Sequence, residues 1–160
     1  MDVAVVMGSI SDLPKIQGTI DTLDSLGISY NTKIISAHRM PNELQAFGSS
    51  AKYEQYKVII AAAGGAAHLP GMLAANTTLP VIGIPVKTST LNGVDSLLSI
   101  VQMPSGVPVA TVAIGDAGAK NAALLAAQIL AISNDKIAQS LDDFRERQTR
   151  EAIDSNEQLH

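Results

Sequence analysis

The chain has 160 residues, a formal net charge of −4 at pH 7 and no cysteine, with 46% hydrophobic and only 3% aromatic residues. The length fits one domain with a sizeable core, and the acidic balance disfavours nucleic-acid binding, which needs a basic face. Without cysteine there are no disulfides, thiolate nucleophiles or zinc–thiolate sites. No segment has the pattern of a signal peptide or a membrane span, so we expect a cytoplasmic protein.

Short apolar runs alternate with helical patterns along the chain. The continuous apolar run at 3–7 predicts a buried strand, and the leucine and isoleucine spacing over 13–26 predicts a helix that ends at Gly27. Further strands are predicted at 30–35, 57–63, 80–86 and 107–114, and further helices at 43–53, 67–75, 117–132 and 137–151. Strands alternating with helices predict an α/β fold with a doubly wound sheet.

The last two predicted helices bear on assembly. The helix at 117–132 is apolar almost all round and must be covered on every side, which one small domain rarely achieves. The helix at 137–151 carries a thin apolar stripe of Ile137, Leu141 and Phe144, and fits either its own domain or a neighbouring subunit. We therefore expect a homo-oligomer, with an α/β domain at 1–133 and a helical extension at 134–160 that packs on a neighbouring subunit.

Ligands of doubly wound sheets bind at the carboxyl ends of the strands. After the first strand, Gly8 permits a tight turn, and Ser9 and Ser11 offer donors at a helix start that suits a phosphate. A carboxylate repels phosphate, so Asp12 more plausibly accepts hydrogen bonds from a ribose. The alternative is that Ser11 or Asp12 only caps the helix, with Pro14 in its first turn. Dinucleotide and P-loop glycine motifs are absent, which disfavours nicotinamide and ATP chemistry.

The second strand end reads SAHRMP at 36–41. Arg39 can hold a phosphate or carboxylate with two parallel hydrogen bonds, and the imidazole of His38 can exchange a proton near neutral pH. Either residue alone is more often structural or simply exposed. Neighbours on an extended segment point to opposite sides, so we expect one to face inward and the other to lie along the rim.

The third strand end reads GGAAHLPG at 64–71. Gly64 and Gly65 permit a close backbone approach, and His68 falls at the start of the next helix. Around it lies an uncharged apolar wall of Ala66, Ala67, Leu69 and Met72. Helix-on-sheet packing explains the small residues without any ligand, but it does not explain the imidazole among them.

Two classes of site are disfavoured. The three histidines, His38, His68 and His160, come with no cysteine and with carboxylates in no ligand-like spacing, so no metal site is expected. The nucleophile motif of serine hydrolases is also absent.

Five segments carry a family resemblance: MGSISD, SAHRMP, AGGAAHLPGMLAANTTLPVIGIPV, GVDSLLSIVQMPSGVPVATVAIG and AGAKNAALLAAQIL, which run from Met7 to Leu130. Together they closely resemble the bacterial class I N5-carboxyaminoimidazole ribonucleotide mutases of de novo purine synthesis. The strings GGAAHLPG and SIVQMP are long and specific. Two positions depart from the family pattern: Met40 stands where threonine is usual and Ala62 where glycine is common, and neither change removes a reactive group.

The resemblance implies a flavodoxin-like three-layer αβα sandwich with a central five-stranded parallel sheet, assembled as a homo-octamer. It implies that a carboxylate moves from the exocyclic nitrogen of a nucleotide substrate to C4 of its imidazole ring, with no metal and no cofactor. It also implies a functional link to an ATP-dependent carboxyaminoimidazole ribonucleotide synthetase.

The same resemblance assigns roles to residues. His38 is implied as the general acid/base. The implied phosphate contacts are Ser9, Ser11 and Arg39, with Asp12 on the ribose. The carboxylate pocket is implied to consist of Gly64, Ala66, Ala67, His68 and Leu69, and the remaining substrate contacts to be Gly8, Ser36 and Ala37.

Two other functions remain to be weighed against this one. A direct carboxylase would act on aminoimidazole ribonucleotide and free CO2 with the same residues. A non-catalytic phosphosugar-binding or receiver-like module is the remote alternative, because a receiver needs an acidic cluster at the first strand end, where this chain reads MGSISD.

Overall fold

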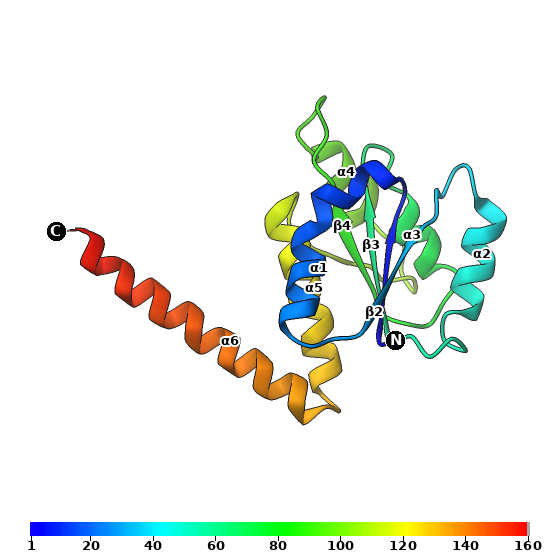
Figure 1. The fold of residues 1–160 in the computed structure, drawn as a ribbon. Coiled ribbons are helices and arrows are strands. Elements are labelled where there is room, and N and C mark those ends of the chain that lie inside the picture. The colour runs from blue at the N-terminus through cyan, green and yellow to red at the C-terminus, as the bar shows by residue number, and fades with distance from the viewer. Residues whose placement is uncertain (160) are drawn as a thin grey trace.

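The computed structural model describes residues 1–159, which form a five-stranded parallel sheet between two layers of helices (Figure 1). The strand order is β2-β1-β3-β4-β5, the flavodoxin-like order, and every neighbouring pair is parallel. The strands are β1 (Val3–Met7), β2 (Tyr30–Ile34), β3 (Val58–Ala63), β4 (Val81–Pro85) and β5 (Ala110–Thr111). The flavodoxin-like α/β prediction is confirmed.

Alternate residues of the central strands enter two separate cores. In β1, Val3, Val5 and Met7 pack toward α1 (Gln17–Ser25) and α5 (Asp116–Ala131), whereas Ala4 and Val6 pack toward the other layer. That other layer contains α2 (Pro41–Ser50), α3 (Leu69–Ala74) and α4 (Val94–Val101). Because both faces are covered, these strands are apolar throughout rather than alternating.

Three elements differ from the sequence prediction. The first helix begins as a 3-10 segment, η1 (Ile10–Ile16), which contains Pro14, and its cap is Ser9 rather than Ser11 or Asp12. The fifth strand has two regular residues instead of eight, because the chain at this sheet edge continues with isolated bonds, such as Val112 N–H to the Gly83 carbonyl (3.1 Å). The helix α4 was not predicted, although Val94, Leu97, Leu98 and Val101 have the i, i+3, i+4, i+7 spacing of a helix and could have revealed it.

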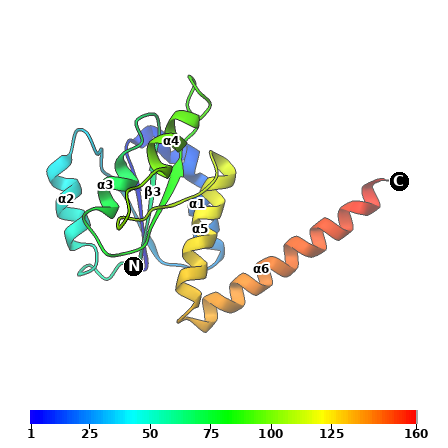
Figure 2. The ribbon, with the colours of Figure 1, turned by 180° about the vertical axis from the view of Figure 1, so that it is seen from behind.

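The C-terminal helix α6 (Asp135–Asp154) leaves the body of the molecule as a long arm (Figures 1 and 2). Asn134 caps its start, and Ile137 and Phe144 are buried against the core formed by α1 and α5. Its far half has no such support, and Ile153 is 62% exposed there. The helix is long but charged, and none of the helices within residues 1–159 combines the length and apolarity needed to cross a lipid bilayer.

The apolar helix α5 is covered largely by its own chain. Its alanine-rich face is fully buried against α1 and the sheet, and the first half of α6 covers a further side. Leu124, Leu125 and Ile129 remain partly buried. The chain itself therefore covers more of α5 than the sequence suggested. The predicted contact with a neighbouring subunit is expected mainly on the projecting part of α6.

Candidate active site

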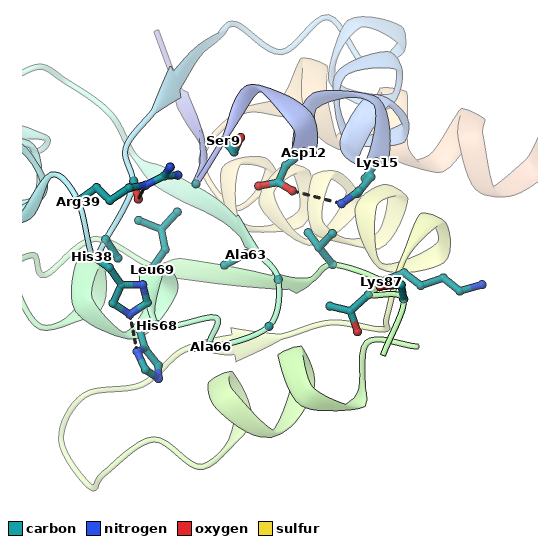
Figure 3. A pocket seen from close by; sticks show the side chains of 18 residues that line it. Ser9, Asp12, Lys15, His38, Arg39, Ala63, Ala66, His68, Leu69 and Lys87 are labelled. Carbon is teal, nitrogen blue, oxygen red and sulfur yellow. Dashed lines mark hydrogen bonds and ion pairs between the residues drawn. The ribbon is translucent and has the colours of Figure 1, made fainter. Parts of the chain in front are cut away.

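A cavity of about 820 Å³ lies at the carboxyl ends of the strands, next to the point where the strand order reverses between β1 and β3 (Figure 3). Four loops line it, one after each of β1, β2, β3 and β4. The lining residues are Gly8, Ser9, Asp12, Lys15, Ser36, Ala37, His38, Arg39, Ala63, Gly64, Gly65, Ala66, His68, Leu69, Val86, Lys87, Thr88 and Ser89.

The structure brings together all but two of the residues that the sequence assigned to the site. Ser11 does not line the cavity; its hydroxyl donates to Ser9 Oγ at 3.0 Å. Ala67 is fully buried in the core below the loop. Ser11 therefore helps to hold Ser9 in place through a hydrogen bond, and Ala67 packs the loop against the core.

Arg39 and Ser9 form a corner suited to an anion. The Arg39 Nε–H donates to Ser36 Oγ at 2.9 Å, which fixes the root of the guanidinium and leaves its terminal donors for another partner. Within residues 1–159, Arg39 has no acidic side chain in ion-pair contact. Ser9 stands across the same corner, so a group with several acceptor oxygens fits between them (Figure 3).

His38 and His68 meet at the lower edge of the cavity (Figure 3). His38 Nε2 lies 2.8 Å from His68 Nδ1, and the two rings stand nearly edge to face at 77°. Whichever ring donates, the other must offer a lone pair, so the contact holds one hydrogen between two bases. Sequence analysis named both residues but not this contact, which joins loops thirty residues apart.

Tight turns bring the two rings together. After β2, the N–H groups of Arg39 and Met40 both bond to the Ser36 carbonyl, at 3.1 and 2.7 Å, so the chain reverses around Ala37 and His38. After β3, Ala67 N–H bonds to the Gly65 carbonyl and His68 N–H to the Ala66 carbonyl, each at 2.8 Å. Backbone hydrogen bonds therefore fix the two turns from which the imidazoles of His38 and His68 project.

Two lysines also line the cavity and escaped the sequence analysis, as did Val86, Thr88 and Ser89. Lys15 Nζ lies 3.5 Å from Asp12 Oδ1, one turn away on η1, and the Asp12 side chain is only 13% exposed. Lys87 follows the carboxyl end of β4. Inspecting that fourth strand end as closely as the first three would have found Lys87, and the spacing of Lys15 from Asp12 was readable as an i,i+3 pair.

The described residues, 1–159, contain no group of three or more histidine, aspartate or glutamate side chains placed to hold a metal ion. His160, which the sequence analysis counted among the histidines, lies outside the described residues. The site thus offers hydroxyls, a guanidinium, two ammonium groups, one carboxylate, two imidazoles and an apolar wall that includes Ala66 and Leu69. Such a set can bind an anionic ligand and exchange a proton with it.

Comparison with known proteins gives a consistent family. The sequence model described as AIR carboxylase matches residues 2–151. The chain is 57% identical to N5-carboxyaminoimidazole ribonucleotide mutase of Brucella melitensis, covering 98% of each chain, and 54% identical to the mutase of Bacillus subtilis, covering 98% and 97%. The crystal structure of Treponema denticola PurE matches with a TM-score of 0.86 at 29% identity, covering 98% of this chain and 97% of that one.

Proposed function

Since this chain belongs to the AIR carboxylase family, we propose that it is an N5-carboxyaminoimidazole ribonucleotide mutase that works in the strand-end cavity. It converts N5-carboxyaminoimidazole ribonucleotide to 4-carboxy-5-aminoimidazole ribonucleotide in purine biosynthesis. The observation that carries this assignment to a site is the His38–His68 contact, which faces the anion corner of Ser9 and Arg39 across one cavity.

Substrate binding follows from the positions of the polar groups. Arg39 and Ser9 hold the 5′-phosphate, and Ser11 supports Ser9 through its hydroxyl. Asp12 accepts hydrogen bonds from the ribose hydroxyls, with Lys15 as its counter-charge. Gly8, Ser36 and Ala37 form the floor between these contacts, so the base reaches toward the histidines.

His38 then transfers a proton in each of two steps. It first gives a proton to the carbamate nitrogen, the N–C bond breaks, and CO2 and aminoimidazole ribonucleotide form. C4 of the ring next attacks CO2 and forms the new C–C bond, and His38 removes the proton that C4 carried. The proton count closes, since one is delivered and one recovered. Proton transfer of this kind contributes typically about 10²- to 10⁴-fold to the rate.

The apolar wall has a role between the two steps. CO2 is neutral and forms few hydrogen bonds, so a small wall of Gly64, Ala66 and Leu69 retains it without binding it tightly. Leu69 is 2% exposed and cannot move aside without disturbing the core. Holding CO2 beside C4 replaces an encounter from solution with a step inside one complex, which supplies much of the remaining rate gain.

We also propose that the chain works as a homo-octamer, with residues 134–160 packed on a neighbouring subunit. The support is the projecting arm of α6 and the 3-10 turn that follows it, Ser155–Leu159. Ile153 on the arm is 62% exposed and Leu159 in the turn is 77% exposed. The half of α6 that does not pack on its own chain is stabilised most simply by contact with another copy. Light scattering at micromolar concentration should give eight times the 16.7 kDa subunit mass. A monomeric mass would contradict the proposal.

The carbamate substrate is unstable and its formation consumes energy. We therefore place the enzyme in the cytoplasm, next in sequence to an ATP-dependent carboxyaminoimidazole ribonucleotide synthetase. A direct contact with that synthetase is not required by the chemistry.

The proposed activity has a direct test. Purified protein should convert N5-carboxyaminoimidazole ribonucleotide to the 4-carboxy product without ATP, and EDTA should leave the rate unchanged. The control is the same assay without protein, because the carbamate decays by itself. A rate equal to that background would refute the assignment.

The family description names a second candidate, a carboxylase acting on aminoimidazole ribonucleotide and free CO2. Both reactions share the second half of the mechanism, attack of C4 on CO2. They differ in the origin of the carboxyl carbon, and the names of the most similar relatives favour the mutase.

A further inference from the structure

Gly65 lies in the loop after β3. It is the one residue of the cavity lining whose backbone N–H and C=O groups both bond to side chains of a helix. Its N–H donates to Ser96 Oγ at 3.0 Å, and its carbonyl accepts from Ser99 Oγ at 3.0 Å. Gly65 has φ +68°, a left-handed conformation that favours glycine. Both serines belong to α4, and no residue of α4, all of which are described, lines the cavity.

We propose that Ser96, assisted by Ser99, is a positioning residue that sets His68 against His38 by fixing Gly65. The inference rests on the proposed function for its kinetic consequence, but the contacts themselves do not depend on it. Neither serine lines the cavity, so their effect on the reaction passes through backbone that they hold. That backbone is the loop at 64–68 and, for Ser96, also Val86, and the double-mutant cycle below separates the two routes.

Ser96 is well placed for this role because its own hydroxyl is fixed. The side chain is fully buried, and its Oγ donates to the Val86 carbonyl at 2.7 Å while accepting from Gly65. One hydroxyl therefore ties the carboxyl end of β4 to the loop that follows β3. A buried hydroxyl with both partners satisfied has little freedom to move.

Ser99 contributes less, because its single proton has two acceptors. Its Oγ lies 3.0 Å from the Gly65 carbonyl and 2.7 Å from the Asp95 carbonyl in its own helix. The shorter distance favours the helix carbonyl. Ser99 thus shares its proton between two carbonyls, whereas Ser96 accepts from Gly65 with a hydroxyl whose own proton has one acceptor.

The position of α4 depends on the sheet below it. A Cβ at Gly83 of β4 would lie 2.9 Å from Ile100 Cγ2, so the absence of a side chain there lets α4 approach the strand closely. Ile100 is 1% exposed and anchors the helix in the core. The core therefore sets the height of Ser96 above β4.

The effect reaches His68 over a short path. Gly65 accepts from Ala67 N–H and Ala66 accepts from His68 N–H, in two consecutive turns. Only Ala66 and Ala67 separate Gly65 from His68, whose imidazole lies 2.8 Å from His38. Because these two hydrogen-bonded turns restrict the backbone, a displacement of Gly65 also displaces the ring of His68.

The test compares Ser96→Ala with a matched buried hydroxyl elsewhere. Thr19 is also fully buried, and its Oγ1 donates to the Ala119 carbonyl at 2.7 Å on the α1–α5 contact. With N5-carboxyaminoimidazole ribonucleotide, Ser96→Ala should lower kcat about 10- to 100-fold, with KM changed less than threefold. This is the loss expected when the imidazole that contacts His38 is displaced by up to 1 Å. Thr19→Val should keep kcat. Equal losses in the two variants would overturn the proposal.

A double-mutant cycle identifies the path. If Ser96 acts through His68, then adding Ser96→Ala to His68→Ala should change kcat less than twofold. A full further loss in that background would overturn the proposal. If Ser96→Ala fails to fold, the pair Ser99→Ala and Ser99→Thr decides: the first should lose activity severalfold, and the second, which keeps the hydroxyl, should recover most of it. Equal activity in these two would also contradict it.

Amide hydrogen exchange separates this proposal from the proposed function. Peptides covering 64–69 should exchange faster in Ser96→Ala than in the wild type and remain unchanged in Thr19→Val, with no substrate present. Unchanged exchange in Ser96→Ala would overturn the proposal that Ser96 fixes Gly65, even if the enzyme is active. A wild type inactive on the carbamate overturns the function and leaves this exchange result to decide whether Ser96 fixes Gly65.

Discussion

The two ends of the parallel strands, called the amino edge and the carboxyl edge below, differ in whether their polar groups have partners within the chain. At the amino edge, Asp2 accepts from the Ser29 hydroxyl at 2.6 Å and pairs with Lys57 Nζ at 2.9 Å, so charge and hydrogen bonds are matched within the chain. At the carboxyl edge, Arg39 has no acidic partner within residues 1–159, and it shares a cavity with two imidazoles. The pairs at the amino edge hold strands together. At the carboxyl edge Asp12 is paired with Lys15, but Arg39 is left for a ligand.

The largest effect on activity is expected at His38. His38→Asn keeps a polar side chain but cannot carry a proton between nitrogen and carbon. Turnover of the carbamate should fall by about 10²- to 10⁴-fold, the usual range for loss of a general acid/base. Unfolding midpoint and circular dichroism should stay close to wild type, since His38 is exposed. Retained turnover would exclude His38 as the proton carrier.

The next largest effect is expected at Arg39. Arg39→Ala removes the donors proposed for the phosphate, and hydrogen bonds to charged groups contribute about 1.5–3 kcal/mol, which corresponds to a KM raised roughly 10- to 100-fold. The value of kcat should change less. Arg39→Lys keeps the charge without the planar fork and should fall between. An unchanged KM in both variants would place the phosphate elsewhere in the cavity.

The smallest effect on activity is expected at the amino edge. The Ser29 hydroxyl, and after it Lys57, lower the pKa of the Asp2 carboxyl below its ordinary value of 3.8. A lowered pKa stabilises the fold above the unfolded-state pKa, and that contribution is lost as the pH falls through the folded-state value. Asp2→Asn should therefore reduce the free energy of unfolding at neutral pH, by at most about 1 kcal/mol for a partly exposed pair.

Two measurements check that prediction. Urea unfolding at several pH values should show the gap between wild type and Asp2→Asn closing below about pH 4, near the reference pKa of an aspartate. Carbamate turnover at neutral pH should be the same in both proteins. A gap that persists in acid, or a loss of turnover, would contradict the division of labour between the edges.

The sequence was a good guide to the sheet and to the loops around the cavity. Residues 3–7, 57–63 and 80–86 are apolar runs between glycine, proline or polar residues, and each contains a buried strand. Such runs are legible because a strand covered on both faces has no polar positions. The candidate site residues after those strands could be recognised for a different reason: ligands of such sheets bind at the carboxyl ends of the strands.

What the sequence could not supply depends on contacts between distant segments. The His38–His68 contact and the Ser96–Gly65 bond join residues thirty and thirty-one positions apart, and no local pattern encodes them. The fifth strand was overestimated because its apolar residues face a sheet edge with one neighbour, β4, where few ladder bonds form. Tertiary packing settled both points.

The central claim is that a carboxyl group moves within one bound nucleotide at the carboxyl edge of the sheet. The most direct measurement supplies substrate with 13C in the carbamate carboxyl group, in excess unlabelled bicarbonate, and determines the isotope at the C4 carboxylate early in the reaction. We predict that most of the product keeps the 13C, because CO2 recombines before it leaves the cavity. Product carrying mainly unlabelled carbon from bicarbonate would contradict the claim and identify a direct carboxylase.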